Sequence, residues 1–168
     1  RSVDMGNIRK IKALLAIIST EVPMLVDITK LATLTGIART TMLAYLQYLH
    51  EAKLIRLLYS DDLSVKKMQK PDKILMENTN LLQALSLQVP NIGTMRETFF
   101  CNQLGYTHQV EYNKRGDYLI DHKYVFEIGG KAKNGKQVAN MENAYIASDE
   151  CDYPIGNKLP LWLFGLMY

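Results

Sequence analysis

The residues whose types and spacing could do chemistry are concentrated in one short stretch, YVFEIGGKAKNGKQV, at positions 124–138. Here an apolar run ends at Glu127, two glycines follow, and Lys131, Lys133 and Lys136 come next. Three interpretations fit these residues: a glycine-rich loop that cradles the phosphates of a nucleotide, a strand-end carboxylate that holds a divalent cation, or a basic hairpin without chemistry.

The nucleotide interpretation fails at the last position of the loop. Gly130, Gly135 and Lys136 match a phosphate-binding loop, but Gln137 stands where that loop needs a hydroxyl for Mg²⁺. The chain also lacks room for an ATPase core. We therefore expect no ATP site in this chain, although the same lysines could contact the phosphates of a nucleic acid.

The elements that must position these residues follow from the pattern of residues 81–168. We expect a connecting helix at residues 81–88 and a longer helix at 93–106, followed by three strands within 108–128. A helix with a strand should follow at 136–148, and an apolar segment at 159–168 should close the domain. Glu97 lies on the longer helix, and the pair Asp121-His122 lies near a hairpin turn. The order predicts an α+β domain around a small mixed sheet.

Residues 1–80 predict a different module, which begins with three helices. Apolar residues recur at three- and four-residue spacings from Ile8 to Ile18, which is typical of a helix with one buried face. Asp27 and Gly36 are cap signals for a short helix at 28–35. A third helix follows, for which Thr40 or Thr41 could be the cap.

Two strand-like runs, at residues 54–60 and 72–78, follow this third helix and flank a polar loop with a basic cluster. Helix, short helix, turn, longer helix and two strands is the order of a winged helix-turn-helix, which we predict for residues 1–80. We assign residues 81–168 to the second domain.

Charge favours nucleic acid as a partner of the first module. Residues 1–75 carry 12 Lys/Arg against 7 Asp/Glu, whereas residues 76–168 carry 8 against 10. Basic side chains supply most of the salt-dependent affinity of a protein for a phosphate backbone. The candidate contacts are Arg39, Thr40, Thr41 and Gln47 on the third helix and Lys66, Lys67, Lys70 and Lys73 in the wing. We expect DNA rather than RNA, with protein docking as the alternative.

Three carboxylates complete the second module: Glu97 on the helix, Asp117 at the start of the second strand, and Glu127 at the end of the third. This order resembles the PD-(D/E)XK nuclease-like core. The resemblance implies that these carboxylates are catalytic and bind Mg²⁺. Members place a lysine two residues after the acid, where this chain has Gly129. The paired glycines indicate either a bend that lets Lys131 enter the site or a site that has lost its chemistry.

The whole chain also resembles the C-terminal region of a family of prokaryotic AAA-type ATPases, a domain of unknown function in a version seen in Bacteroides-type bacteria. The motifs that carry this resemblance are TTMLAYLQYLHEAKLI, KPDKILMEN, GTMRETFFCNQL, GDYLID, FEIGGKAKNGKQ and PLWLFGLMY. It implies that an ATPase domain, absent from this chain, precedes the winged helix and is its partner.

The predicted function is therefore nucleic-acid binding by the C-terminal region of an ATPase, with an Mg²⁺-dependent nuclease-like site. The alternative is a catalytically inactive module that docks proteins for the ATPase. No apolar run reaches the roughly 20 residues of a membrane span. The two cysteines have no metal-site spacing, and we expect them to be reduced in the cytoplasm. The oligomeric state stays open.

Overall fold

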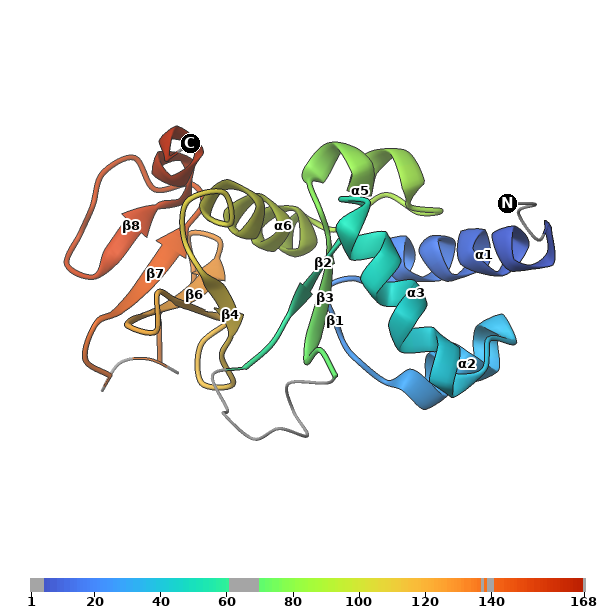
Figure 1. Ribbon diagram of the computed structural model, residues 1–168. Coiled ribbons are helices and arrows are strands. Elements are labelled where there is room, and N and C mark those ends of the chain that lie inside the picture. The colour runs from blue at the N-terminus through green and yellow to red at the C-terminus, as the bar shows by residue number, and fades with distance from the viewer. Residues whose placement is uncertain (1–4, 61–69, 137, 139–140, 168) are drawn as a thin grey trace.

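Two groups of elements lie side by side in the computed structural model, with α6 between them (Figure 1). The structure describes residues 5–60, 70–136, 138 and 141–167. The helices are α1 Met5–Glu21, α2 Ile28–Thr35, α3 Arg39–Glu51, α5 Thr79–Leu85, α6 Ile92–Leu104 and the 3₁₀ helix η1 Leu161–Leu166. The strands are β1 Met24–Leu25, β2 Ile55–Leu58, β3 Lys73–Met76, β4 Val110–Tyr112, β5 Tyr118–Ile120, β6 Tyr124–Gly129, β7 Ala144–Ser148 and β8 Lys158–Pro160.

Local signals set the limits of α2 as predicted. The Asp27 side chain accepts a hydrogen bond from the Lys30 N–H at 3.0 Å, and Gly36 ends the helix in the left-handed conformation with a φ of 64°. For α3 the predicted threonine cap was wrong, because the N-cap residue is Ala38 and makes no side-chain hydrogen bond. The helix starts where its first turn can pack Met42 into the core.

The first sheet is antiparallel, with the order β1-β3-β2, so β3 is its central strand. Every residue of β2 and β3 is buried, and the two faces of the sheet bury different partners. One face packs against α1, α2 and α3 through Ile55, Leu57, Ile74 and Met76. The opposite face carries Arg56, Leu58, Lys73 and Leu75, of which the two leucines join the core of the second group of elements. The first sheet is therefore shared by both cores.

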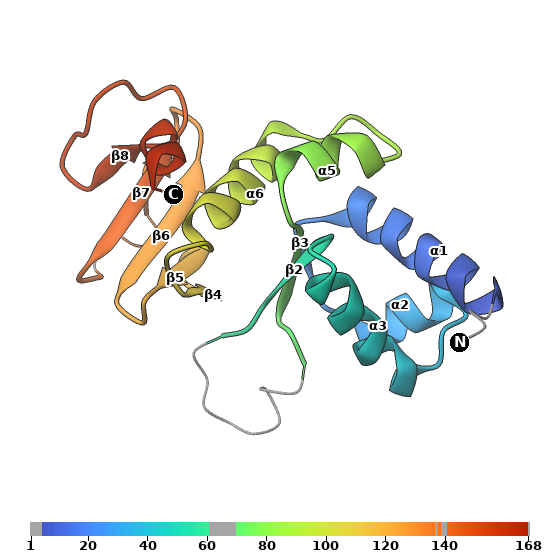
Figure 2. The ribbon, with the colours of Figure 1, turned by 45° about the horizontal axis from the view of Figure 1, so that its top comes forward.

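The second sheet is mixed, with the order β4-β5-β6-β7-β8. The pairs β4–β5 and β5–β6 are antiparallel, whereas β6–β7 and β7–β8 are parallel. Figure 2 shows α6 lying against this sheet on the side that faces the first module. Phe100 of α6 stacks against Tyr118 and contacts Phe126 and Phe164, and this aromatic cluster joins the helix, the sheet and η1.

The β5–β6 hairpin turns at Asp121 and His122, as predicted. Both residues have positive φ angles, 50° and 54°, and the Lys123 N–H donates to the Ile120 carbonyl at 3.0 Å. Two consecutive left-handed residues match the right-handed twist of the flanking strands. This short connection sets the register that pairs Tyr118 with Phe126.

Two predicted elements differ from the structure. The helix expected after the basic loop is absent from the described part of residues 130–143, which forms turns and irregular chain, although β7 confirms the strand. The closing segment contributes only a three-residue strand before the chain turns into η1, which places Leu161 and Phe164 in the core. Cys101 and Cys151 are free, as expected.

Candidate functional site

Asp117 comes directly before β5 and lies beside the part of β6 that carries Glu127. The Asp117 N–H donates to the Phe126 carbonyl at 2.8 Å, and the Ile128 N–H donates to Asp117 Oδ2 at 2.6 Å. Asp117 thus bonds to both chain neighbours of Glu127. The structure therefore holds Asp117 against the β6 backbone on either side of Glu127.

A tight turn before β5 positions Asp117. The Asn113 side chain accepts hydrogen bonds from the N–H groups of Arg115 and Gly116, at 2.9 and 3.0 Å. A β-carbon at Gly116 would lie 2.7 Å from Val125 Cγ1 and 2.9 Å from the Phe126 carbonyl oxygen. Only glycine lets the chain approach β6 closely enough for the Asp117 carboxylate to reach the Ile128 N–H.

Glu127 is 3% exposed and is paired with a lysine. Lys133 Nζ lies 2.9 Å from Glu127 Oε1. A β-carbon added to Gly129 would lie 2.8 Å from the Cβ, Cγ and Cδ atoms of Lys133. The Lys133 side chain therefore fills the space that a side chain at position 129 would occupy. Since residues 127 and 129 point to the same face of β6, Lys133 stands where the nuclease motif would place its lysine.

The sequence prediction placed Lys131 in this site, whereas the structure places Lys133 beside Glu127. The Lys131 side chain is exposed, and its carbonyl accepts a hydrogen bond from Lys158 Nζ at 2.7 Å. A turn closed by the Lys133 N–H and the Gly130 carbonyl, at 3.0 Å, carries the chain past the glycines and returns Lys133 to the strand. The bend needs four residues, so the second lysine and not the first reaches Glu127.

Glu97 meets a different lysine, one from the first module. Lys73 Nζ lies 2.6 Å from Glu97 Oε2, and the Tyr118 hydroxyl donates to the same oxygen at 2.5 Å. The Lys73 ammonium also lies 4.6 Å from the centre of the Tyr118 ring. Sequence reasoning placed Lys73 on an exposed wing, but it is 8% exposed because the second module covers that face of the sheet.

The electrostatics of Asp117 link these groups. Burial raises the pKa of the Asp117 carboxyl, and the negative charge of Glu97 raises this pKa further. The hydrogen bond from the Ile128 N–H and the charges of Lys73 and Lys133 lower the pKa of Asp117. Both lysines therefore act on the same carboxylate, from opposite modules of the chain.

The candidate ligands of a divalent cation at this site are the carboxylates of Asp117, next to β5, and of Glu127 on β6. Among the described residues, no group of three His, Cys, Asp or Glu side chains is close enough to hold a metal ion. Mg²⁺, however, is usually held by one or two carboxylates and keeps several waters. In the described part of the chain, the buried Glu127 Oε2 has no hydrogen-bond partner. The oxygen donors of Asp117 and Glu127 are thus of the type that Mg²⁺ binds, whereas the three-carboxylate site expected from the sequence is not preformed among the described residues.

The predicted nucleic-acid contacts on α3 are accessible. Arg39, Thr40 and Gln47 are exposed and Thr41 is half-buried. Arg39 donates to Thr29 Oγ1 at 2.5 Å, and Gln47 donates to Glu51 at 3.1 Å. Arg39 thus connects α3 to α2, whereas the Gln47 side chain is held along the surface of α3.

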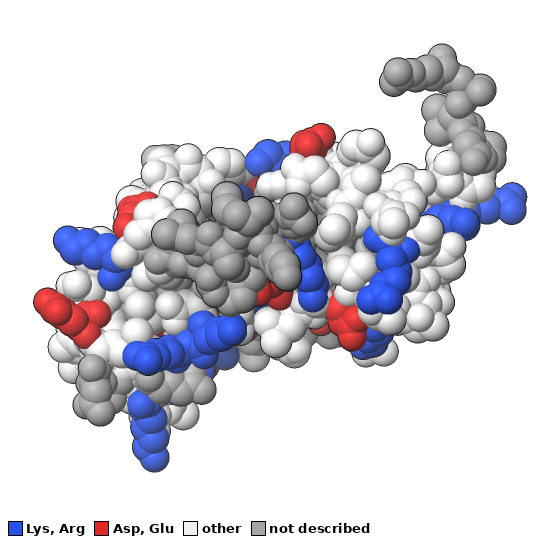
Figure 3. Space-filling model, turned by 60° about the horizontal axis from the view of Figure 1, so that its bottom comes forward, with Lys and Arg blue, Asp and Glu red and all other residues white. Residues whose placement is uncertain are grey.

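Of the predicted wing lysines, Lys70 is exposed, whereas Lys66 and Lys67 lie outside the described residues. Figure 3 shows lysine and arginine side chains at both ends of one face of the molecule, with acidic side chains among them. The basic residues therefore do not form a single uniform patch over the described part of this face.

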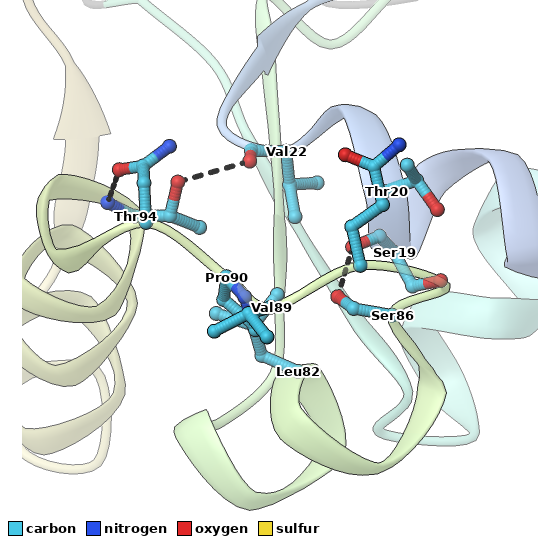
Figure 4. Close-up of a pocket in the computed structure, with 10 residues that line it drawn as sticks. Ser19, Thr20, Val22, Leu82, Ser86, Val89, Pro90 and Thr94 are labelled. Atoms are coloured by element: carbon cyan, nitrogen blue, oxygen red, sulfur yellow. Dashed lines mark hydrogen bonds between the residues drawn. The ribbon is translucent and has the colours of Figure 1, made fainter.

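A pocket of about 200 Å³ lies where the end of α1, α5 and the start of α6 meet (Figure 4). Its lining is uncharged, and its hydroxyl groups bond to the chain: Ser86 Oγ donates to the Ser19 carbonyl at 2.5 Å and Thr94 Oγ1 to the Val22 carbonyl at 3.2 Å. These bonds connect the modules across more than 60 residues of sequence and indicate a structural role.

Comparison of the chain with protein-family models, with curated proteins and with solved structures found no match. The resemblances noted in the sequence thus stay hypotheses. Among the described residues, no helix is long and apolar enough to cross a membrane.

Proposed function

We propose that this protein binds DNA through residues 1–80 and cleaves phosphodiester bonds at a divalent-metal site formed by Asp117, Glu127 and Lys133. The observation that carries the proposal is the position of Lys133, whose side chain fills the space above Gly129 and whose ammonium pairs with Glu127. A lysine and carboxylates from adjacent strands are the groups that such hydrolysis needs, and here the lysine comes from the turn after β6 instead of from the strand itself.

Element order supports a winged helix for the first module. Three helices precede β2 and β3, β1 follows α1, and the sheet order is β1-β3-β2. The segment between β2 and β3 would then be the wing. The exposed polar residues of α3, Arg39 and Gln47, are of the types that read base edges in the major groove.

Element order also supports a PD-(D/E)XK nuclease-like core for the second module. A helix that carries Glu97 precedes three antiparallel strands, and a parallel strand follows. Asp117 stands at the start of the second of these strands and Glu127 near the end of the third. The crossover from β6 to β7 is the main departure, because its described residues form turns instead of a helix.

The residues of the chain would divide the chemistry among them. Asp117 and Glu127 would hold the cation, which when bound supplies Lewis acidity toward a phosphate oxygen. The Lys133 ammonium would orient the attacking water and offset the charge of the phosphate. Since its side chain is 34% exposed, Lys133 can reach a substrate at the surface. Burial of Glu127 keeps its carboxylate in place.

Cleavage of a supercoiled plasmid in the presence of Mn²⁺ or Mg²⁺ tests the proposal. We expect nicking that depends on the ion and is abolished by Asp117→Asn, which keeps the shape and the hydrogen bond to Ile128. Lys123→Ala, a change at the exposed end of the β5–β6 hairpin, is the matched control and should cleave normally. Ion-dependent nicking that survives in Asp117→Asn would show that the activity comes from elsewhere and would overturn the proposal.

A second candidate function is a catalytically inactive module that docks proteins. The observation in its favour is that lysines already neutralise two of the carboxylates, through Lys73–Glu97 and Lys133–Glu127. In either case we propose, from the motifs of the sequence, that the chain serves as the C-terminal region of an AAA-type ATPase. Failure of the wild-type protein to bind Mn²⁺ would favour the docking function.

A further inference from the structure

Lys73 is a buried cation that the first module contributes to the second. It lies on β3, the central strand of the first sheet, and only 9% of its side chain is exposed. Its ammonium contacts Glu97 Oε2 at 2.6 Å and lies over the rings of Tyr118 and Tyr112, 4.6 and 5.9 Å from their centres. The carboxylate of Glu97 and two aromatic rings thus enclose this ammonium.

Glu97 and Glu127 each pair with a lysine through one oxygen, and they differ in how firmly that lysine is enclosed. Glu97 Oε2 receives both Lys73 and the Tyr118 hydroxyl, so its charge is compensated inside the protein. Glu127 pairs through Oε1 only, and its Oε2 is buried without a partner in the described part of the chain. The lysine that pairs with Glu127 is also on a turn and is one-third exposed, whereas Lys73 is enclosed.

We propose that the Lys73 ammonium occupies the carboxylate of Glu97, so that Glu97 does not bind the metal ion. Asp117 and Glu127 are then the carboxylates that hold the ion. The first module thereby completes the site of the second, because the counter-charge of Glu97 comes from β3. This inference rests on the metal site of the proposed function, but it makes a separate statement about which carboxylates bind the ion and which one binds Lys73.

Calorimetric titration of the full chain with Mn²⁺ tests the inference without any measurement of cleavage. We expect one ion per chain, with affinity weakened at least about tenfold by Asp117→Asn or Glu127→Gln and changed by less than about threefold by Glu97→Gln. If Glu97→Gln weakens Mn²⁺ binding as much as Asp117→Asn does, the inference about Lys73 is overturned, although the proposed metal site still stands. Absence of Mn²⁺ binding by the wild type would instead remove the metal site on which the inference rests.

Changes at Lys73 give a second readout. In Lys73→Met the carboxylate of Glu97 loses its counter-charge, so Mn²⁺ should bind roughly threefold more tightly or more, or a second ion should bind. The double variant Lys73→Met/Glu97→Gln removes both charges together and avoids an unpaired buried group. It should bind one Mn²⁺ with wild-type affinity, and thermal melting confirms that each variant is folded. Weaker binding by the folded double variant would contradict the role of Lys73 as a substitute cation.

Discussion

The side chain of Lys133 lies in the space above Gly129, four residues earlier in the chain. The atoms from Cβ to Cδ of Lys133 cover the α-carbon of Gly129, so that lysine and glycine together present one ammonium at the strand position two residues after Glu127. The absence of a side chain at position 129 is thus what allows a lysine from the following turn to enter the site.

This relationship predicts that the lysine can be moved back to the strand. Lys133→Ala should lower the rate of Mn²⁺-dependent plasmid nicking by about 10²-fold or more, because an ammonium that acts on the reacting groups is lost. Adding Gly129→Lys to that variant should recover much of the rate, since the new side chain enters the vacated space. Lys131→Ala is the control and should nick at the wild-type rate, while an equal loss there would contradict the assignment of Lys133.

The raised pKa of Asp117 predicts how stability changes with pH in the absence of metal. The folded protein binds a proton to Asp117 at a higher pH than the unfolded chain does, for which the ordinary pKa is 3.8. The stability that protonation of Asp117 contributes is therefore fully present below the pKa of the unfolded chain. It is lost as pH rises through the raised pKa of the folded protein.

Asp117→Asn should consequently melt at a higher temperature than the wild type at pH 7 in EDTA, and the difference should shrink as pH falls toward 4. A gain of about 1 kcal/mol would appear as roughly 2–4 °C in a chain of this size. Thermal melting across this pH range is the measurement. A difference that grows on acidification would contradict the role of burial.

The buried ion pair of Arg56 and Glu77 predicts a large loss of stability on truncation. Arg56 Nη2 lies 2.6 Å from Glu77 Oε1, with the two side chains 10% and 4% exposed. Glu77→Ala leaves the guanidinium buried without its partner and should cost about 3–5 kcal/mol in the free energy of unfolding. Urea denaturation measures this loss. The matched control is Glu21→Ala in the exposed pair with Lys30, which should cost no more than about 1 kcal/mol.

The exposed residues of α3 predict the salt dependence of DNA binding. If Arg39 contacts a phosphate, Arg39→Ala should reduce the slope of log affinity against log salt by about 0.9. Fluorescence anisotropy with a labelled duplex at several salt concentrations gives the slope. Arg115→Ala, on the exposed turn before β5, removes the same charge from the second module and should leave the slope unchanged. Equal effects of the two variants would indicate a diffuse charge effect in place of an α3 interface.

Local signals in the sequence determined much of the secondary structure. Asp27 and Gly36 defined α2 because a cap is made within a few residues, and apolar periodicity located α1, α3 and α6 for the same reason. The Asp121-His122 hairpin was also predictable, since its strands flank a short polar turn. The neighbouring positions of the strands next to Asp117 and Glu127 were predictable as well, because strands joined by a hairpin must be neighbours.

The tertiary structure alone decided which lysine serves which carboxylate. Lys73 has the sequence surroundings of an exposed wing residue, and it is buried only because α6 and the second sheet cover the outer face of β3. Lys133 and not Lys131 reaches Glu127 because of the geometry of a four-residue bend, which the spacing of apolar residues does not predict. Ion pairs between residues distant in sequence depend on how whole elements pack, and packing is set by the sum of many contacts rather than by the residues adjacent to the pair.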